Sequence, residues 1–355
     1  MGEMRRLPSF SKLTSLTMGA AQFRGFRAKM VSPQEQNTLT KLLHAEHYSS
    51  GLDEGTTDST RIEQQRWYAA EMEMHWIVQW AERKHAGDLE AQAMAVKRAV
   101  LERVDYHKPL SYIIGNQPFF QSEIICRPPL LIPRTETEEM VHWLHRKYLK
   151  AIEGPIKMLD MCCGTGCIGV SLARKTPTLN VLCADVSPEA VACTTENAEA
   201  SGVADRVKVL QSDMFESVPI PEVKEDLFDI LISNPPYILE TQYSSLPRSV
   251  KSWEDKLCLV GDGKREGVKF HYYEELCTIG HKYVKKAKPP STLKKIAAAI
   301  RGEEKAEHPN IVLELGIQAE NVALLFDQSK LWKDVELHMD HSGQPRWLAA
   351  CAIDR

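Results

Sequence analysis

The chain has 355 residues, of which 43% are hydrophobic and 26% charged, which is an ordinary balance for a globular protein with room for two domains. It contains no run of 18 apolar residues, so neither a membrane span nor a membrane partner is expected. The net charge is −4, and residues 1–30 hold six basic side chains against one acid, so the remaining body is more acidic still. Such a body is a poor general binder of phosphate backbones, which makes nucleic acid an unexpected partner.

Residues 1–30 are rich in Arg and Ser and nearly free of acids, with a loose apolar stripe from Leu7 to Met18. This composition is typical of a mitochondrial transit peptide, and it lacks the continuous apolar core of a secretory signal. We therefore expect import into the mitochondrial matrix. The alternative is a disordered basic tail that carries no address.

Residues 31–104 are predicted to form a small helical domain. Apolar residues recur at helical spacing over 37–48, 60–84 and 89–104, with Gly- and Asp-containing breaks between them. Trp67, Trp76 and Trp80 are expected to make core contacts. Residues 105–134 then change character, because prolines and glycines interrupt any helix there and 119–126 favours an extended segment or hairpin. We interpret 105–134 as a connector, and Thr135 as the start of a helix that runs to about 150.

Residues 135–355 are predicted to form a second domain, in which strands and helices alternate. The expected strands are 157–162, 180–185, 207–212, 228–233 and 311–315, and the expected helices are 167–175, 188–200, 268–285 and 319–329. This rhythm predicts an α/β fold with a doubly wound, mostly parallel sheet, and the pair 335–339 and 346–352 suggests an antiparallel edge. The Lys-, Glu- and Pro-rich segment 285–308 interrupts the rhythm and is interpreted as an exposed insertion.

The nine cysteines are odd in number and include no C-x-x-C pair. They favour reduced, mostly structural thiols in an intracellular compartment. Cys162, Cys163 and Cys167 lie close in sequence, but their spacing fits no common zinc pattern, so no metal is expected.

A Gly-rich segment from Asp160 to Cys167 falls where the first predicted strand turns into the first helix. Glycines there let the backbone approach a ligand, and the helix N-terminus offers free N–H groups. Asp185 ends the second strand, where a carboxylate can accept both hydroxyls of a ribose. The third strand ends near Asp213, where an adenine could lie. The predicted nucleoside-binding residues are Asp160, Cys162, Cys163, Gly164, Thr165, Gly166, Asp185, Asp213, Met214 and Asn234.

The nucleoside is not specified by these residues alone. Residues 164–169 also fit G-x-G-x-x-G, the dinucleotide fingerprint, which is a weak signal by itself. An acid just before the turn, here Asp160, is more typical of S-adenosylmethionine enzymes. A structural glycine turn without a ligand is disfavoured by Asp185.

The most informative segment is Asn234-Pro235-Pro236-Tyr237, which follows a buried strand. The prolines cannot continue a central strand, so an amide, carbonyls and a ring are left at the strand end. The fourth strand of a doubly wound sheet commonly lies beside the first, at the point where ligands bind. The Asn234 oxygen and the Pro235 carbonyl can then accept the two hydrogens of a substrate NH2, while Tyr237 packs on its flat face. A proline-stiffened turn is the alternative.

With these motifs the chain resembles the HemK/PrmC family of protein-(glutamine-N5) methyltransferases, of a mitochondrial type. The resemblance runs from about 108 to 346 and rests on segments 109–115, 131–138, 160–167, 185–190, 212–216, 233–238, 313–316 and 340–346. It implies a class I S-adenosylmethionine-dependent fold preceded by a helical domain that recognises the substrate. The implied reaction moves a methyl group from S-adenosylmethionine to the glutamine of the Gly-Gly-Gln tripeptide in a peptide-chain release factor, a component of translation termination. With a transit peptide, that factor is mitochondrial.

The resemblance also implies roles for individual residues. Asn234, Pro235 and Tyr237 are the expected catalytic group, and they bind substrate together with Pro236. Arg134 and Glu136 are expected to order the substrate loop, the alternative being an exposed capping-turn ion pair that contributes little.

The chain departs from the family in three places. Cys162 stands where the family has a glycine and would be strained if φ is positive there. Trp253-Glu254-Asp255 replaces an acidic-Pro segment, and the 285–308 insertion is foreign. Two alternatives stay open: an adenine-N6 nucleic-acid methyltransferase, which shares Asn-Pro-Pro-Tyr, and a catalytically silent scaffold that keeps the cofactor site.

Overall fold

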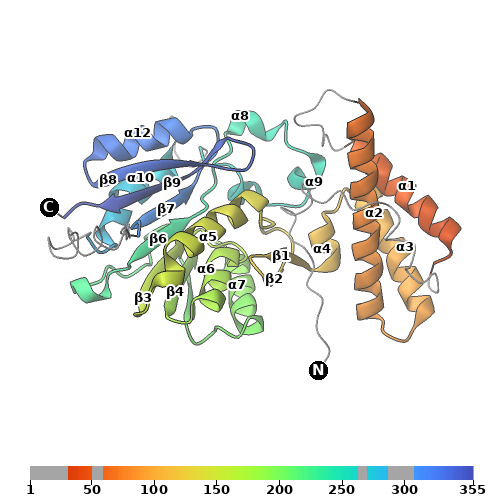
Figure 1. Ribbon diagram of the computed structural model, residues 1–355, viewed down its shortest axis with the longest axis horizontal. Helices are drawn as coiled ribbons and strands as arrows, with labels where there is room; N and C mark the ends of the chain where they lie inside the picture. Colours follow the sequence, from red (N-terminus) through yellow and green to blue (C-terminus); the bar gives the residue numbers. More distant parts are fainter. Residues whose placement is uncertain (1–30, 50–58, 263–269, 287–307, 355) are drawn as a thin grey trace, which may run out of the picture.

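The computed structural model describes residues 31–49, 59–262, 270–286 and 308–354. The expected transit peptide, and all but the ends of the expected insertion, lie outside these residues. A bundle of helices stands beside a larger α/β unit, and a hairpin lies between them (Figure 1). Within the described residues, no helix combines the length and the apolar character needed to cross a bilayer.

The helical bundle contains α1 (Pro33–Ser49), α2 (Ser59–Lys84) and α3 (Leu89–Asp105), close to the predicted ranges. The Asp88 side chain caps α3 by accepting from the backbone N–H of Ala91 at 2.9 Å. A short helix, α4 (Leu110–Ile114), contributes Ile113 to the same core. The sequence placed this segment in the connector, because Pro109 and Gly115 flank it too closely for any helical period to show.

The connector forms the predicted hairpin, with β1 (Asn116–Phe119) antiparallel to β2 (Ser122–Ile125). Its strands begin earlier than expected, and the turn consists of Phe120 and Gln121, both with positive φ. Because neither residue is a glycine, the usual sequence signal of a tight hairpin is missing. The next helix is α5 (Thr135–Lys147), followed by the 3-10 turn Leu149–Ala151.

The sheet has seven strands in the order β5-β4-β3-β6-β7-β9-β8. These are β3 (Ile156–Met161), β4 (Leu179–Asp185), β5 (Val207–Gln211), β6 (Ile230–Ser233), β7 (Ile311–Glu314), β8 (Trp332–Met339) and β9 (Pro345–Ala352). The doubly wound, mostly parallel prediction is confirmed. The predicted antiparallel edge is confirmed too: β9 pairs antiparallel with both β7 and β8, and β8 is the outermost strand.

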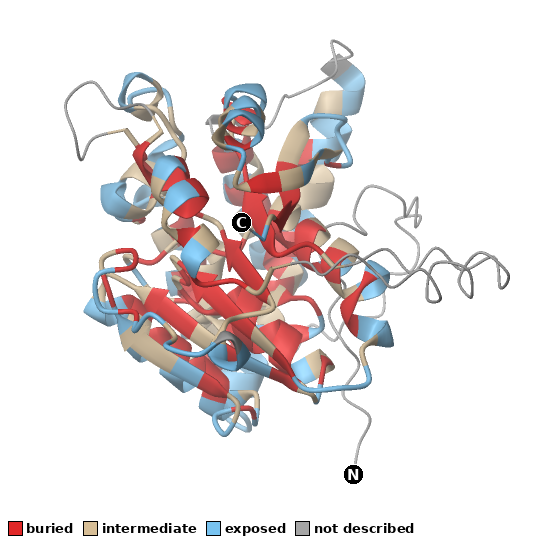
Figure 2. Cartoon of the chain, turned by 90° about the vertical axis from the view of Figure 1, so that its left-hand side faces the viewer, coloured by how far each residue is buried: buried red, intermediate tan, exposed pale blue. Residues whose placement is uncertain are grey.

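Helices cover both faces of the sheet. Alternate residues of β3 separate the two cores: Met158 packs on the side of α5 and α6 (Cys167–Lys175), and Leu159 on the side of α10 (His271–Thr278) and α12 (Ala319–Ser329). Helix α7 (Pro188–Ala200) contacts β4 and β5. The buried strands run through the middle of this unit (Figure 2). The helix predicted over 268–285 is shorter, ending at Thr278 before the 3-10 turn Gly280–Lys282.

Candidate functional site

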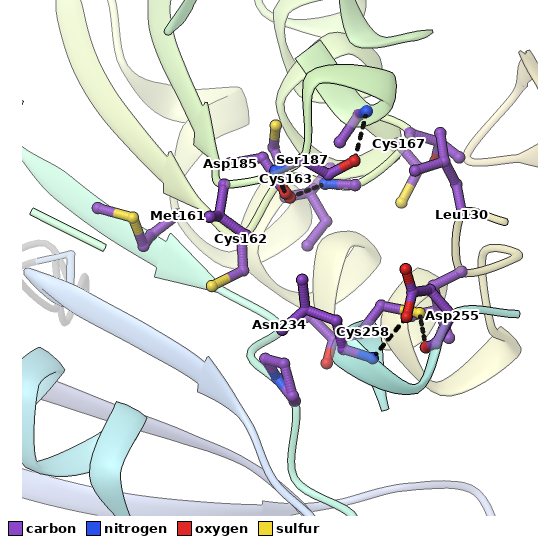
Figure 3. Close-up of a pocket in the computed structure, with 18 of the residues that line it drawn as sticks. Leu130, Met161, Cys162, Cys163, Cys167, Asp185, Ser187, Asn234, Asp255 and Cys258 are labelled. Atoms are coloured by element: carbon purple, nitrogen blue, oxygen red, sulfur yellow. Dashed lines mark hydrogen bonds between the residues drawn. The ribbon is translucent and has the colours of Figure 1, made fainter. Parts of the chain in front are cut away.

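Four side chains lie in one row across the carboxyl ends of neighbouring strands. The parallel register pairs Met161 with Ala184, Met161 with Ser233, and Ser233 with Leu313. The next residue along each strand gives the row Asp185, Cys162, Asn234, Glu314, which we call the strand-end row. The first strand β3 lies beside the fourth, β6, so the centre of this row is the switch point of the sheet. Asp185, Cys162 and Asn234 surround one cavity there (Figure 3).

The Gly-rich turn between β3 and α6 is built from left-handed backbone. Cys162, Gly164 and Gly166 have φ of 59°, 56° and 75°. Gly166 precedes α6, and a Cβ on it would come within 2.6 Å of the Thr194 side chain. Cys162 does have the positive φ that is the condition for strain at a non-glycine residue, and its sulfur lies 3.8 Å from that of Met214. This turn brings Cys163, Gly164 and Thr165 to the cavity wall.

Asp185 holds the turn in place. Its carboxylate accepts from the N–H of Gly164 at 2.8 Å and from the N–H of Ser187, the N-cap of α7, at 3.0 Å. Burial raises the pKa of Asp185, although the backbone hydrogen bonds oppose the shift. Asp213 and Met214 follow β5 and line the same cavity. Asp185 and Asp213 therefore both border the cavity beside the turn, but part of the hydrogen-bonding capacity of Asp185 serves the protein backbone.

Asp160 precedes the turn in β3 and is not itself among the cavity-lining residues. It is fully buried, and one of its oxygens accepts from the N–H of Gly169 at 2.9 Å. A Cβ on Gly169 would come within 2.9 Å of that same oxygen, so the glycine makes room for the carboxylate. Burial raises the pKa of Asp160 to about 7. Asp160 thus supports the start of α6, and it is not among the residues that line the cavity.

Asn234 faces the cavity from the opposite wall. Its Nδ2 donates to Oγ1 of Thr137, in the first turn of α5, at 3.2 Å. The Thr137 hydroxyl in turn donates to Oε2 of Glu314 at 2.6 Å. Pro236 also lines the cavity, whereas Pro235 is buried and is not among the lining residues. Since Nδ2 is directed at Thr137, the Asn234 carbonyl oxygen is the atom left for a bound group.

Tyr237 is directed at Glu314 and is not among the residues that line the cavity. Its hydroxyl donates to Oε1 of Glu314 at 3.3 Å, and its carbonyl accepts from the Gln318 side chain at 2.9 Å. A Cβ on Gly316 would come within 2.7 Å of the tyrosine ring. The expectation that this ring packs on the flat face of a substrate amide finds no support in this position.

The loop after the motif is held by the residues that depart from the family pattern. It contains α8 (Glu240–Tyr243), α9 (Arg248–Lys251) and the 3-10 turn Lys256–Cys258. Nη2 of Arg134 contacts both oxygens of Glu254, at 2.7 and 2.5 Å, and the Glu254 side chain is almost fully buried. Asp255 reaches the cavity wall. The alternative of an exposed ion pair with Glu136 is therefore wrong, because the arginine is paired 120 positions away.

A second cavity lies between the helical bundle and the α/β unit. Its lining includes Trp76 and Arg83 of α2 on one side and Arg134 and Glu136 on the other. Pro133 lines both cavities, so the two are neighbours. Arg134 and Glu136 thus border this second cavity and not the one that contains Asn234.

Sequence reasoning missed Thr137 and Glu314 as site residues. The one available signal was an acid at the end of an otherwise apolar strand, since Glu314 follows Ile311-Val312-Leu313 and is fully buried. A buried carboxylate requires partners, which points to a polar site. The nine cysteines are free thiols, as expected. Among the described residues no three His, Cys, Asp or Glu side chains are grouped to hold a metal ion.

Residues 146–246 match the family model "Methyltransferase small domain". The chain is 31% identical to the release factor glutamine methyltransferase of Nitratidesulfovibrio vulgaris, over 68% of this chain and 72% of that protein. It is 31% identical to the protein of that name in Chlorobaculum tepidum, over 67% of this chain and 76% of that one. It is 30% identical to the human MTRF1L release factor glutamine methyltransferase, over 51% of this chain and 54% of that protein.

Proposed function

The chain belongs to the release factor glutamine methyltransferases, S-adenosylmethionine-dependent enzymes of the class I methyltransferase fold, and we propose that it methylates the glutamine of the Gly-Gly-Gln tripeptide in a peptide-chain release factor. The observation that carries the proposal is the Asn234 amide. One N–H of this amide donates to Thr137, which directs the nitrogen away and leaves the carbonyl oxygen for the cavity that the Gly-rich turn also borders.

The residues around the first cavity fit S-adenosylmethionine. Carboxylates of Asp185 and Asp213 suit the hydroxyls and amine of a nucleoside, and Val186 and Met214 supply apolar surface for its base. The backbone of Cys162–Gly166 would lie along the amino-acid end of the cofactor. When bound, the cofactor supplies a methyl group on a sulfonium centre.

The chain's own residues position the acceptor. We propose that the Asn234 oxygen accepts one hydrogen of the substrate NH2, and that the backbone carbonyl of Pro235 accepts the other, although the Pro235 side chain is buried and does not line the cavity. An amide nitrogen is a poor nucleophile because its lone pair is delocalised, and acceptors that hold its hydrogens stabilise the charge that develops as it reacts. Correct positioning alone is worth roughly 7–11 kcal/mol in the best intramolecular models. No strong general base is needed, because the proton can leave afterwards to water.

We further propose that the second cavity receives the protein chain on either side of the glutamine. It adjoins the first cavity at Pro133 and is bordered by residues of the helical bundle, the part expected to recognise the substrate. Arg134 acts there by holding Glu254, which fixes the loop beyond the motif. Tyr237 supports the motif from the side of Glu314 and does not itself touch the substrate.

A methyl-transfer assay tests the function. The purified protein is incubated with labelled S-adenosylmethionine and a release factor, beside the same factor with its Gly-Gly-Gln glutamine changed to asparagine. We expect methylation of the first factor alone, located to the glutamine by mass spectrometry. Methylation of duplex DNA but of no release factor would establish the adenine-N6 alternative. Cofactor binding without methylation of any release factor would favour the silent scaffold.

The mitochondrial assignment is a separate proposal, supported by the composition of residues 1–30. A fluorescent reporter fused to residues 1–30 should accumulate in mitochondria. A version with Arg5, Arg6, Arg24 and Arg27 changed to glutamine should not. Equal cytosolic fluorescence from both fusions would contradict it, and the methylation assay would then use a cytosolic release factor.

A further inference from the structure

The buried carboxylate of Glu314 is linked to both ends of the Asn234–Tyr237 motif, directly to Tyr237 and through Thr137 to Asn234. Glu314 ends β7 and is 0% exposed. Its Oε2 lies 2.6 Å from the hydroxyl of Thr137, and its Oε1 lies 3.3 Å from the hydroxyl of Tyr237. Thr137 is the partner of Asn234, so Glu314 reaches the cavity-facing amide through a single hydroxyl.

The number of hydrogens in this chain of contacts determines which way the amide faces. An ionised carboxylate only accepts, so the single hydrogen of the Thr137 hydroxyl goes to Glu314. The hydroxyl oxygen must then accept from Asn234, and the Asn234 carbonyl is left for the cavity. A protonated Glu314 can instead donate to Thr137, which then donates to the Asn234 carbonyl. In that arrangement the Asn234 NH2 faces the cavity, where it would meet the NH2 of an incoming glutamine, and two donors cannot pair.

We propose that Glu314 is a positioning residue that sets the orientation of the Asn234 amide through Thr137, and that only its ionised form supports methyl transfer. The inference rests on the proposed function, because it assumes that the acceptor is an NH2 group. It predicts that this protein loses activity on mild acidification by a reversal of hydrogen bonds, without loss of the fold.

The surroundings of Glu314 raise its pKa into the pH range in which enzyme activity can be measured. Burial raises its pKa to about 7, although the hydrogen bond from Thr137 and the charge of Arg346 on β9 oppose the shift. Glu136 on α5 adds a raising charge, and the Tyr237 hydrogen bond lowers the pKa. From α10, the Tyr273 hydroxyl donates to the backbone carbonyl of Glu314 and leaves the carboxylate to its other partners.

Activity and stability respond to Glu314 in opposite directions. Its pKa in the folded protein, about 7, is above the ordinary glutamate pKa of 4.5, so unfolding releases a proton between these pH values. The stabilising contribution of this residue is therefore full below about 4.5 and is lost as the pH rises through about 7. Acidification from pH 8 to pH 6 should lower kcat while Glu314 makes the fold more stable.

The test compares pH profiles of kcat, with a Gly-Gly-Gln release factor, for four proteins: wild type, Glu314→Gln, Thr137→Val and Thr137→Ser. Wild-type kcat should fall about tenfold from pH 8 to pH 6, as a single group with a pKa near 7 requires. Thr137→Ser keeps the hydroxyl and should keep the profile. Glu314→Gln and Thr137→Val should lower kcat on the order of 10- to 100-fold and flatten the profile. An unchanged inflection in Glu314→Gln, or full activity in Thr137→Val, overturns the proposal.

A second readout does not depend on catalysis. The side-chain NH2 signals of Asn234, assigned by their absence in Asn234→Ala, should shift with pH around 7 in the ¹⁵N-labelled protein and stay fixed in Glu314→Gln. Asp160 also has a pKa near 7 but does not touch Asn234 or Thr137, so Asp160→Asn should leave the shift in place. If the shift is present but no release factor is methylated, the link from Glu314 through Thr137 to Asn234, which we call the relay, is supported and the proposed substrate is contradicted. If the shift is absent in wild type, the relay fails whatever the substrate.

Discussion

The two halves of the strand-end row differ in whether backbone or side-chain groups form the site. On the side of β4 and β3, backbone atoms form the site: three residues with positive φ make the turn, and Asp185 fixes it by accepting from two backbone N–H groups. On the side of β6 and β7, side chains form the site. Asn234, Thr137, Glu314 and Tyr237 make one chain of hydrogen bonds, anchored by a buried carboxylate.

This difference bears on how each half tolerates change. A backbone site depends on conformation, so a cysteine such as Cys162 can take part in it with a positive φ, at the cost of local strain. A chain of side-chain hydrogen bonds depends on the donors and acceptors of each member, so no member can lose its hydrogen-bonding group without altering the next. We therefore expect substitutions in the β6/β7 half to remove transfer while cofactor binding persists, and substitutions in the β4/β3 half to weaken cofactor binding first.

The sharpest test of the β6/β7 half is Asn234→Ala. It removes an acceptor that serves the developing charge, so kcat should fall roughly 10²- to 10³-fold, the loss seen when one such group is removed from an active site. The dissociation constant for S-adenosylmethionine, measured by calorimetry, should stay within about threefold, because the Gly-rich turn is untouched. A tenfold weaker cofactor with unchanged kcat would reverse the assignment of the two halves.

The converse change, Asp185→Ala, should act on the cofactor. It removes a charged acceptor from the cavity and also leaves the Gly164 N–H without its partner. Hydrogen bonds to charged groups contribute roughly 1.5–3 kcal/mol, so cofactor affinity should fall roughly 10- to 150-fold. At saturating cofactor, kcat should recover most of its wild-type value. A kcat that stays depressed at saturation would mean that Asp185 also shapes the β6/β7 half.

Gly316→Ala tests how tightly the relay is packed. The new Cβ would meet the Tyr237 ring at 2.7 Å, and displacing the ring pulls its hydroxyl away from Glu314. Overpacking of this kind costs typically 1–3 kcal/mol in the free energy of unfolding, measured by urea denaturation. Gly154→Ala is the matched control, because nothing lies within 4 Å of its added Cβ and its φ is not in the positive range. Equal stability of the two variants would show that Tyr237 moves freely.

The sequence predicted those features that depend on residues close together in the chain. Apolar periodicity located the strands of the sheet, and glycines with an acid located the turn. The relay could not be predicted from the sequence. Asn234 and Thr137 are 97 positions apart, and Thr137 and Glu314 are 177 positions apart. Which strand end faces which helix depends on the sheet order, and no local pattern contains that order. The same reason explains why the partner of Arg134 was unforeseen, since Glu254 lies 120 positions away.

Cys162→Gly should have the smallest effect, and it tests whether the turn acts through its backbone. A non-glycine residue in the left-handed region costs of order 1–3 kcal/mol, which glycine would relieve. Against this, glycine loses the packing of the sulfur near Met214 and adds roughly 0.4–1 kcal/mol of unfolded-chain entropy. The net change in the free energy of unfolding should therefore stay within about 1 kcal/mol of zero. Cys163→Gly is the control: Cys163 is buried without a positive φ, so it has no strain to release and should lose about 1–2 kcal/mol. If Cys162→Gly instead weakens cofactor binding tenfold, the cysteine side chain takes part in recognition, and the contrast between a backbone half and a side-chain half no longer holds.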